Sequence, residues 1–227
     1  MNCWICGDKA SSGEHKIKAS DLRSLFGRVN QKTPLYIHTD AKRNQAVGGI
    51  KSDRLKFKSL LCERCNNQRT QPHDRAWEKL SNYLRSRQPP IRPGSIVRLD
   101  TVFPGSVRKS MLDVHLFFLK LFGCIIREHS VLLDLAPFSS AILGQSPHPK
   151  VHLAFWAVTD TRFHTRAGQS SINTAQLQGH VAFASWFYFV GALSVNVMYA
   201  EPSEHRRGLR QAWHPHSISK RLHIVGE

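Results

Sequence analysis

Acidic side chains are scarce in this sequence. Its 227 residues contain 16 Asp and Glu against 32 Lys and Arg, which gives a net charge of +16 when the 13 histidines are neutral. The excess is concentrated, because residues 1–93 carry +11 and residues 94–227 carry +5. Such a basic segment attracts polyanions through long-range fields and the release of counterions. The charge therefore favours nucleic acid as the partner, with a basic surface that serves solubility as the alternative.

Repeats, low-complexity tracts and an apolar leader are also missing. Hydrophobic residues make up 41% and charged residues 21%, an ordinary globular composition that excludes a chain dominated by disorder. Residues 1–16 carry charge where a secretory signal has an apolar run, so we expect a cytoplasmic protein. Residues 181–200 are uncharged, but their β-branched and aromatic residues and the internal Gly191 predict two buried strands. We therefore expect no membrane segment.

The sequence changes character at residues 85–95, where three prolines and a glycine follow a helical pattern. Such a stretch is typical of a linker. The role of the chain beyond it and the oligomeric state, including a homodimer, are open at this stage. We predict an α+β protein with a first domain at 1–88, a linker at 89–96, a mixed α+β domain at 97–203 and a basic tail at 204–227.

Local patterns predict the main elements. Thr70 as an N-cap and Pro72 in the first turn indicate a helix of about four turns that ends before the prolines. A second, mostly buried helix is expected over residues 106–128. Strands are expected at 95–103, at 151–160 and within 181–200.

Cysteine is rare, with five residues, and four of them form two pairs with the spacing CxxC. In a reducing compartment such pairs usually bind a metal and do not form disulfides. Two residues between thiolates let a tight turn aim both sulfurs at one ion, and two such turns complete a tetrahedral shell for Zn²⁺. Four protein ligands leave no position for substrate, so this zinc is expected to be structural. The ligands are Cys3, Cys6, Cys62 and Cys65, while Cys124 lies in an apolar run.

The residues around these pairs resemble a known family. CWICGDKASSGEHKIKASDL followed by KSLLCERCNNQR is similar to the HNH endonucleases that carry a CxxC, an acidic residue before a histidine near a strand end, and a second CxxC followed by a polar metal ligand. The resemblance covers residues 1 to about 85 and implies a ββα-metal fold. In that fold a hairpin presents Glu14 and His15, and a helix near the second cysteine pair presents further ligands.

The resemblance also implies the site chemistry. His15 would be the general base that takes a proton from the attacking water. Glu14 and Asn66 would bind a divalent cation, and the amide oxygen of Asn66 suits Mg²⁺ or Mn²⁺ better than zinc. The candidates to complete the cation site are Asn67, His73 and Asp74, for which helix capping is the competing interpretation. The candidates to contact nucleic acid are Lys16, Lys18, Arg64 and Arg69.

One position departs from the family. Phe57 stands where the family has its middle asparagine, which orients the base histidine through a hydrogen bond. The role must then fall to a backbone carbonyl, to another side chain such as Asp53, or to nothing, in which case the domain would only bind.

Two functions follow from this interpretation. The first is a metal-dependent endonuclease that hydrolyses phosphodiester bonds, with DNA favoured over RNA as the substrate. The resemblance implies that the products carry a 5′-phosphate and a 3′-hydroxyl. The second is a non-catalytic zinc module that binds nucleic acid, with a C-terminal domain that contacts a protein partner. An enzymatic site within residues 97–227 is not expected, since that part has no Ser/His/Asp order, phosphate loop or paired-carboxylate pattern.

Overall fold

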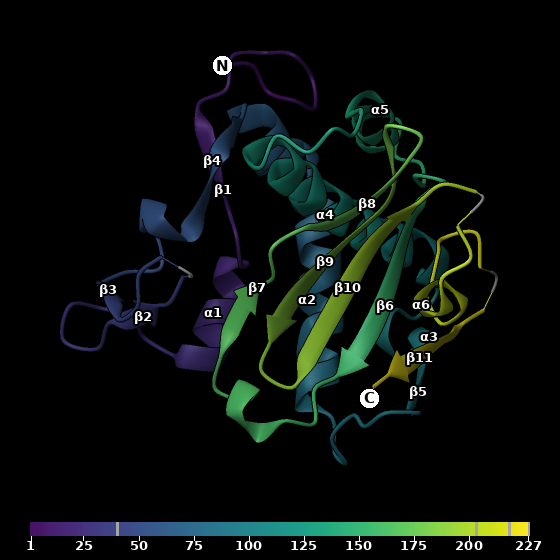
Figure 1. Cartoon of the computed structure of the whole chain (residues 1–227). Coiled ribbons are helices and arrows are strands. Elements are labelled where there is room, and N and C mark those ends of the chain that lie inside the picture. Colours follow the sequence, from purple (N-terminus) through teal and green to yellow (C-terminus); the bar gives the residue numbers. More distant parts are fainter. Residues whose placement is uncertain (40, 203, 218, 227) are drawn as a thin grey trace.

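The computed structural model describes residues 1–39, 41–202, 204–217 and 219–226 and has a mixed α+β architecture, as predicted (Figure 1). The described helices are α1 (Ala19–Phe26), α2 (Gln71–Ser86), α3 (Leu99–Val102), α4 (Val107–Glu128), α5 (Ala136–Leu143) and α6 (Arg207–Arg210). The strands are β1 (Ser12–His15), β2 (Leu35–Ile37), β3 (Gln45–Val47), β4 (Lys56–Leu61), β5 (Ile96–Arg98), β6 (Val151–Ala157), β7 (Ala167–Gln169), β8 (Asn173–Leu177), β9 (His180–Val190), β10 (Leu193–Ala200) and β11 (Arg221–Val225).

The largest sheet has seven strands in the order β5-β11-β6-β10-β9-β7, with β8 also paired to β9. Its pairs are antiparallel except β11 with β6. β9 and β10 form a hairpin that turns at Gly191, whose φ of +60° lies in the region that favours glycine. The prediction of two buried strands within residues 181–200 is therefore confirmed, and none of the described helices is long and apolar enough to cross a membrane.

Helices α2 and α4 cover one face of this sheet (Figure 1). α4 is buried around almost its whole circumference from Met111 to Ile126, because it lies between the sheet and the N-terminal strands. α2 buries a narrower stripe that includes Trp77, Leu80 and Leu84, the spacing of one helix face. The indole of Trp77 stacks on a phenyl ring of α4 at a centroid distance of 5.7 Å. Both predicted helices are therefore present, and they form the centre of the core.

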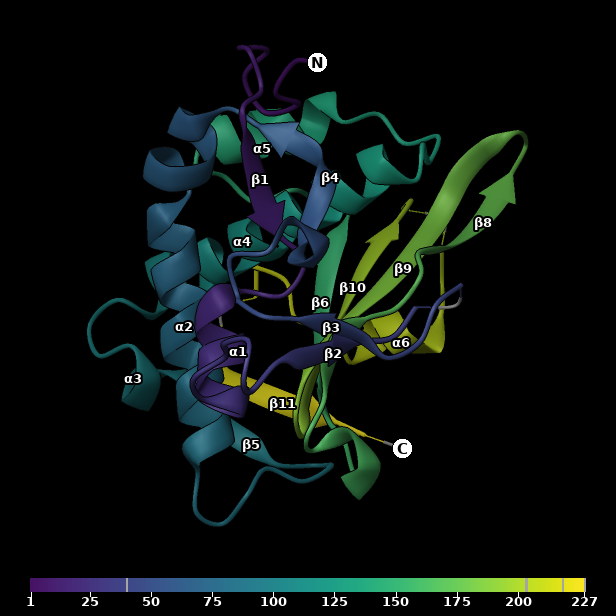
Figure 2. The same ribbon diagram turned by 90° about the vertical axis from the view of Figure 1, so that its left-hand side faces the viewer.

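A small antiparallel pair, β1 with β4, packs on α4 and is separate from the large sheet (Figure 2). The resemblance implied a hairpin here, but residues 16–55 separate the two strands and include α1 and the β2–β3 hairpin. The predicted strand at 95–103 is also wrong in its second half, because the chain leaves the sheet after Arg98 and forms α3. Val97, Leu99 and Val102 are buried, at spacings of two and three residues that suit a short strand and one helical turn alike.

Residues from both predicted domains share one hydrophobic core. The ring of Trp4 lies so close to Gly123 of α4 that a Cβ atom there would stand 2.4 Å from it. The buried carboxylate of Asp21 accepts hydrogen bonds from Trp77 Nε1 at 2.7 Å and from Tyr188 Oη of β9 at 2.6 Å. Ile91, within the predicted linker, is buried. The N-terminal segment is thus packed directly against the C-terminal sheet and helices.

Candidate functional site

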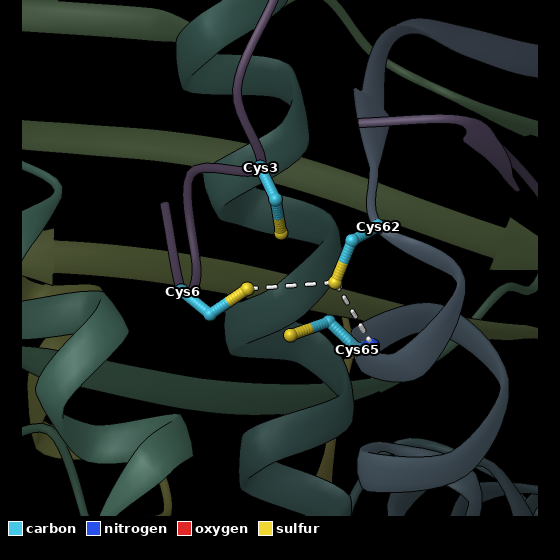
Figure 3. A group of neighbouring side chains, drawn as sticks. All are labelled: Cys3, Cys6, Cys62 and Cys65. Carbon is cyan, nitrogen blue, oxygen red and sulfur yellow. Dashed lines mark hydrogen bonds between the residues drawn. The ribbon is translucent and has the colours of Figure 1, made fainter. Parts of the chain in front are cut away.

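Four cysteine side chains converge at the N-terminal end of the molecule (Figure 3). Their sulfur atoms all lie within 4.8 Å of one another, and all four are free thiols. Cys3 and Cys6 come from the loop before β1, Cys62 directly follows β4, and Cys65 lies on the π-helical segment η2 (Arg64–Arg69). The predicted grouping of the two CxxC pairs is therefore confirmed.

The donor set suits a tetrahedral zinc ion. Zinc–sulfur bonds of about 2.3 Å place the sulfurs of such a site about 3.8 Å apart. Cys6 Sγ and Cys62 Sγ are 3.4 Å apart, close to that spacing. Cys65 N donates to Cys62 Sγ at 3.3 Å, and Arg69 Nη1 donates to Cys65 Sγ at 2.9 Å. Such donors stabilise thiolates that bind a metal, so these four residues can hold a structural zinc.

Asn66 connects η2 to β1 directly after the cysteine cluster. Asn66, the residue after Cys65, donates from Nδ2 to Ser12 Oγ at 2.8 Å and to Gly13 O at 3.4 Å. Its Oδ1 is buried and has no hydrogen-bond partner among the described residues. π-helical turns are uncommon and occur frequently at functional sites. An amide oxygen held in place by its own NH₂ group and left without a donor is a ready ligand for a cation.

Next to Asn66 lies a cleft of about 330 Å³ between β1, η2 and the start of α2. Most of the residues that the sequence singled out for catalysis or cation binding meet in it, although Glu14 and Asn66 are 52 positions apart in the chain. The side chains and backbone that line it belong to Ser12, Gly13, Glu14, His15, Lys18, Ala19, Lys51, Lys56, Asn66, Asn67 and Asp74.

His15 is held by a backbone carbonyl. Its Nε2 donates to Ile50 O at 3.0 Å, which places the proton of the neutral ring on Nε2 and leaves Nδ1 with a lone pair. Partial burial lowers the pKa of His15 below its usual value, and the nearby cations Lys56, Arg23 and Lys18 lower it further against the opposing bond to Ile50. The ring is therefore neutral at pH 7. Of the three alternatives for the role of the missing asparagine, the geometry supports the backbone carbonyl.

An irregular strand pairing presents Glu14 and His15. Gly13 pairs with Leu60 and His15 with Lys56, so β4 advances four residues where β1 advances two. A Cβ atom at Gly13 would stand 2.9 Å from Lys56 Cδ, so the Lys56 side chain packs directly over this glycine. Such irregularities redirect side chains and are common beside active sites.

Lys120 of α4 is the main feature of the site that the sequence-based prediction missed. Its Nζ is fully buried and lies 3.0 Å from Glu14 Oε2, 3.2 Å from Asp74 Oδ1 and 3.2 Å from Thr70 Oγ1. Burial by itself would lower the pKa of Lys120, but the carboxylates of Glu14 and Asp74 outweigh it and raise the pKa above its usual range. A charged ammonium therefore joins these two carboxylates across the predicted domain boundary.

His73 does not reach the cleft. It is fully buried, and its Nδ1 lies 2.8 Å from Asp113 Oδ1 on α4. Asp74 does line the cleft, but its carboxylate faces Lys120 and also Lys18 Nζ at 3.5 Å. The cation ligands expected from the start of α2 are therefore replaced by ion and hydrogen-bond pairs, because α4 packs against this part of α2. We leave His73 and Asp74 out of the proposed ligand set.

Of the four residues predicted to contact nucleic acid, two line the cleft or are exposed and two are engaged in other contacts. Lys18 lines the cleft, and Arg64 is exposed on η2. Lys16 forms an ion pair with Glu128 at 3.0 Å, and Arg69 is committed to Cys65. The sequence-based prediction did not include the two other cleft lysines, which are Lys51 and Lys56.

A signal for Lys120 exists in the sequence. It is a single charge within the apolar run VHLFFLKLFGCII, and a buried lysine requires a carboxylate partner. The carbonyl of Ile50 has no such signal, because any residue supplies a backbone oxygen.

Comparison with known proteins finds no matching family model, no matching curated protein and no matching solved structure. The interpretation of the cleft therefore depends on its own residues and geometry.

Proposed function

We propose that this cleft is the active site of a metal-dependent HNH-type endonuclease that hydrolyses phosphodiester bonds, with DNA as the preferred substrate. One observation carries the proposal. The adjacent Glu14 and His15 line a single cleft together with Asn66, which lies 52 positions after Glu14 and directly follows the cluster residue Cys65. A fold could bury or scatter these residues in many ways, whereas hydrolysis needs a base and cation ligands that face the same substrate position.

In this proposal His15 Nδ1 accepts the proton of the water that attacks phosphorus. The bond from Nε2 to Ile50 O fixes the tautomer and the ring plane. A base held in position by a second partner avoids the cost of orienting it during reaction. Lys51 supplies positive charge along the cleft beside Lys18 and Lys56, which also pair with Asp74 and Asp53, and such charge attracts a phosphate.

Two oxygen donors would hold the catalytic cation. One is the unpartnered Oδ1 of Asn66, and the other is the carboxylate of Glu14, whose Oε2 is fixed by Lys120. Oxygen donors of this kind suit Mg²⁺ or Mn²⁺. Such a cation, when bound, neutralises phosphate charge and stabilises the leaving oxygen. The zinc of the cysteine cluster has a different task, because four thiolates complete its shell.

Single-turnover cleavage of supercoiled plasmid in Mn²⁺ tests the proposal. His15→Ala should lower the rate at least about a hundredfold, the usual contribution of a general base. His164→Ala is the matched control, because His164 Nε2 also donates to a backbone carbonyl at 3.0 Å, that of Val158, but lies outside the cleft. Equal rates for wild type and His15→Ala would refute the proposal, and a loss in both variants would point to a general structural effect.

The second candidate function is a binding module without catalysis. It is favoured by Lys120, since an ammonium already neutralises Glu14 and Asp74 and reduces their attraction for a cation. Binding of a labelled DNA duplex that persists at full strength, together with no cleavage in Mn²⁺ or Mg²⁺, would select this function.

A further inference from the structure

The segment between α1 and β4 carries a surface that the proposed active site does not explain. We define the basic arm as residues 28–54, which include the β2–β3 hairpin. Figure 1 shows this hairpin extending away from the large sheet, and Figure 2, which faces that side, shows it in front of the body beside α1. β2 and β3 pair with each other and with no other described strand. The arm is thus an addition to the fold and not part of its sheets.

Charge is the main property of the basic arm. It contains six basic residues and two acidic ones, Asp40 and Asp53. Asp53 forms an ion pair with Lys56, outside the arm, at 2.8 Å. The basic side chains are all exposed, and none of them forms an ion pair with a described carboxylate. They are Arg28, Lys32, Lys42, Arg43, Lys51 and Arg54.

The arm is connected to the cleft at its C-terminal end. Ile50 accepts the hydrogen bond of His15, and the next residue, Lys51, lines the cleft. Val47 of β3 is buried, with a side chain that is 2% exposed. Tyr36 on β2 is 60% exposed and offers a phenolic hydroxyl beside the cations. Lysine, arginine and tyrosine side chains are common donors to phosphate oxygens in complexes with DNA.

We infer that the basic arm binds the sugar-phosphate backbone of duplex DNA and directs the strand into the cleft. The inference rests on the proposed function for the identity of the substrate, and it adds the surface that holds it. Exposed cations on a projecting hairpin match the regular charge of a phosphate backbone. Because Ile50 also positions His15, DNA held by the arm lies next to the base and not at a remote site.

Fluorescence anisotropy with a labelled 20-base-pair duplex in EDTA measures this binding without cleavage. Lys42→Ala/Arg43→Ala should weaken binding about tenfold near 0.1 M salt and reduce the salt slope by about 2, since each removed cation no longer neutralises a phosphate. The matched control is Arg108→Ala/Lys109→Ala, an exposed pair at the start of α4 with the same change of charge. The control should stay within about twofold of wild type and keep its salt slope.

Each outcome has one meaning. Equal weakening in both double variants would overturn the inference, because overall charge and not the arm would then determine affinity. An arm variant that binds like wild type would also overturn it, even if His15→Ala abolishes cleavage and the proposed function stands. Loss of cleavage in His15→Ala with weakened binding only in the arm variant would support both. A wild-type protein that does not bind the duplex would overturn both.

Discussion

Two histidine-containing regions of the molecule show how burial decides what the same side chain can do. His15 lies in the cleft, partly exposed, with one nitrogen fixed by Ile50 and the other free. His148 belongs to a group of rings in the C-terminal half. The centroid of its ring lies 4.4 Å from that of Phe138, and its backbone oxygen accepts a hydrogen bond from His214 Nε2 at 3.0 Å. The first arrangement leaves a basic nitrogen accessible, and the second packs the ring into a core. The sequence distinguished His15 through the adjacent Glu14 and the cysteine pairs, but it did not indicate how the ring of His148 packs.

The largest expected difference between the two halves concerns zinc. Cys62→Ser removes one of four thiolates and should abolish stoichiometric zinc binding, because the cluster joins the N-terminal loop, β4 and η2. Cys124→Ala is the control, since Cys124 is buried on α4 outside the cluster. Zinc content by mass spectrometry and the thermal unfolding midpoint measure the effect, and we expect a decrease of more than about 10 °C for Cys62→Ser. A full zinc complement in Cys62→Ser would contradict the four-thiolate site.

The second largest effect is expected from acidification, which should reduce folding stability through the buried histidines of the C-terminal half. Burial lowers the pKa of His148 from its usual value to about 4, with a smaller contribution from Lys150, and burial lowers that of His152 to about 4, with a contribution from His214. The unfolded chain takes up protons near pH 6.5, whereas the folded protein does not until about pH 4. The stability that these two neutral histidines contribute is therefore fully present above pH 6.5 and is lost as the pH drops from 6.5 to 4.

Urea unfolding at pH 7.0 and 5.0 measures this decrease, of which His148 contributes roughly 2 kcal/mol. His148→Asn should reduce the pH dependence, because asparagine does not titrate. His205→Asn is the comparison variant, since His205 is exposed. If wild type and His148→Asn lose the same stability between the two pH values, the buried ring is not the cause.

The sequence predicted the parts of the site that depend on local spacing. The CxxC pairs, the helix at α2 and the neighbouring Glu14 and His15 follow from residue type and order. The rest depends on long-range packing. Lys120 reaches Glu14, and His73 meets Asp113, only because α4 packs against both α2 and the β1–β4 pair. Spacing along one segment contains no information on which distant helix packs against it.

The same limit applies to the domain boundary. A proline-rich stretch at residues 85–95 predicts a linker, and the structure nevertheless packs Trp4 against Gly123 and Asp21 against Tyr188 across it. Prolines interrupt helices and strands locally whether or not the flanking parts share a core. The cleft is lined by residues of the N-terminal half, but its Glu14 is held by Lys120 of the other half, across the predicted boundary.

The most direct test is Mn²⁺ binding to the zinc-loaded protein without substrate, followed by electron paramagnetic resonance. We predict one Mn²⁺ per chain in wild type, weakened at least about tenfold by Glu14→Gln and by Asn66→Ala, and unchanged by His15→Ala, because the base is not a ligand. Binding that survives both ligand substitutions, or that disappears in His15→Ala, would contradict a cleft in which the base and the cation ligands are separate groups.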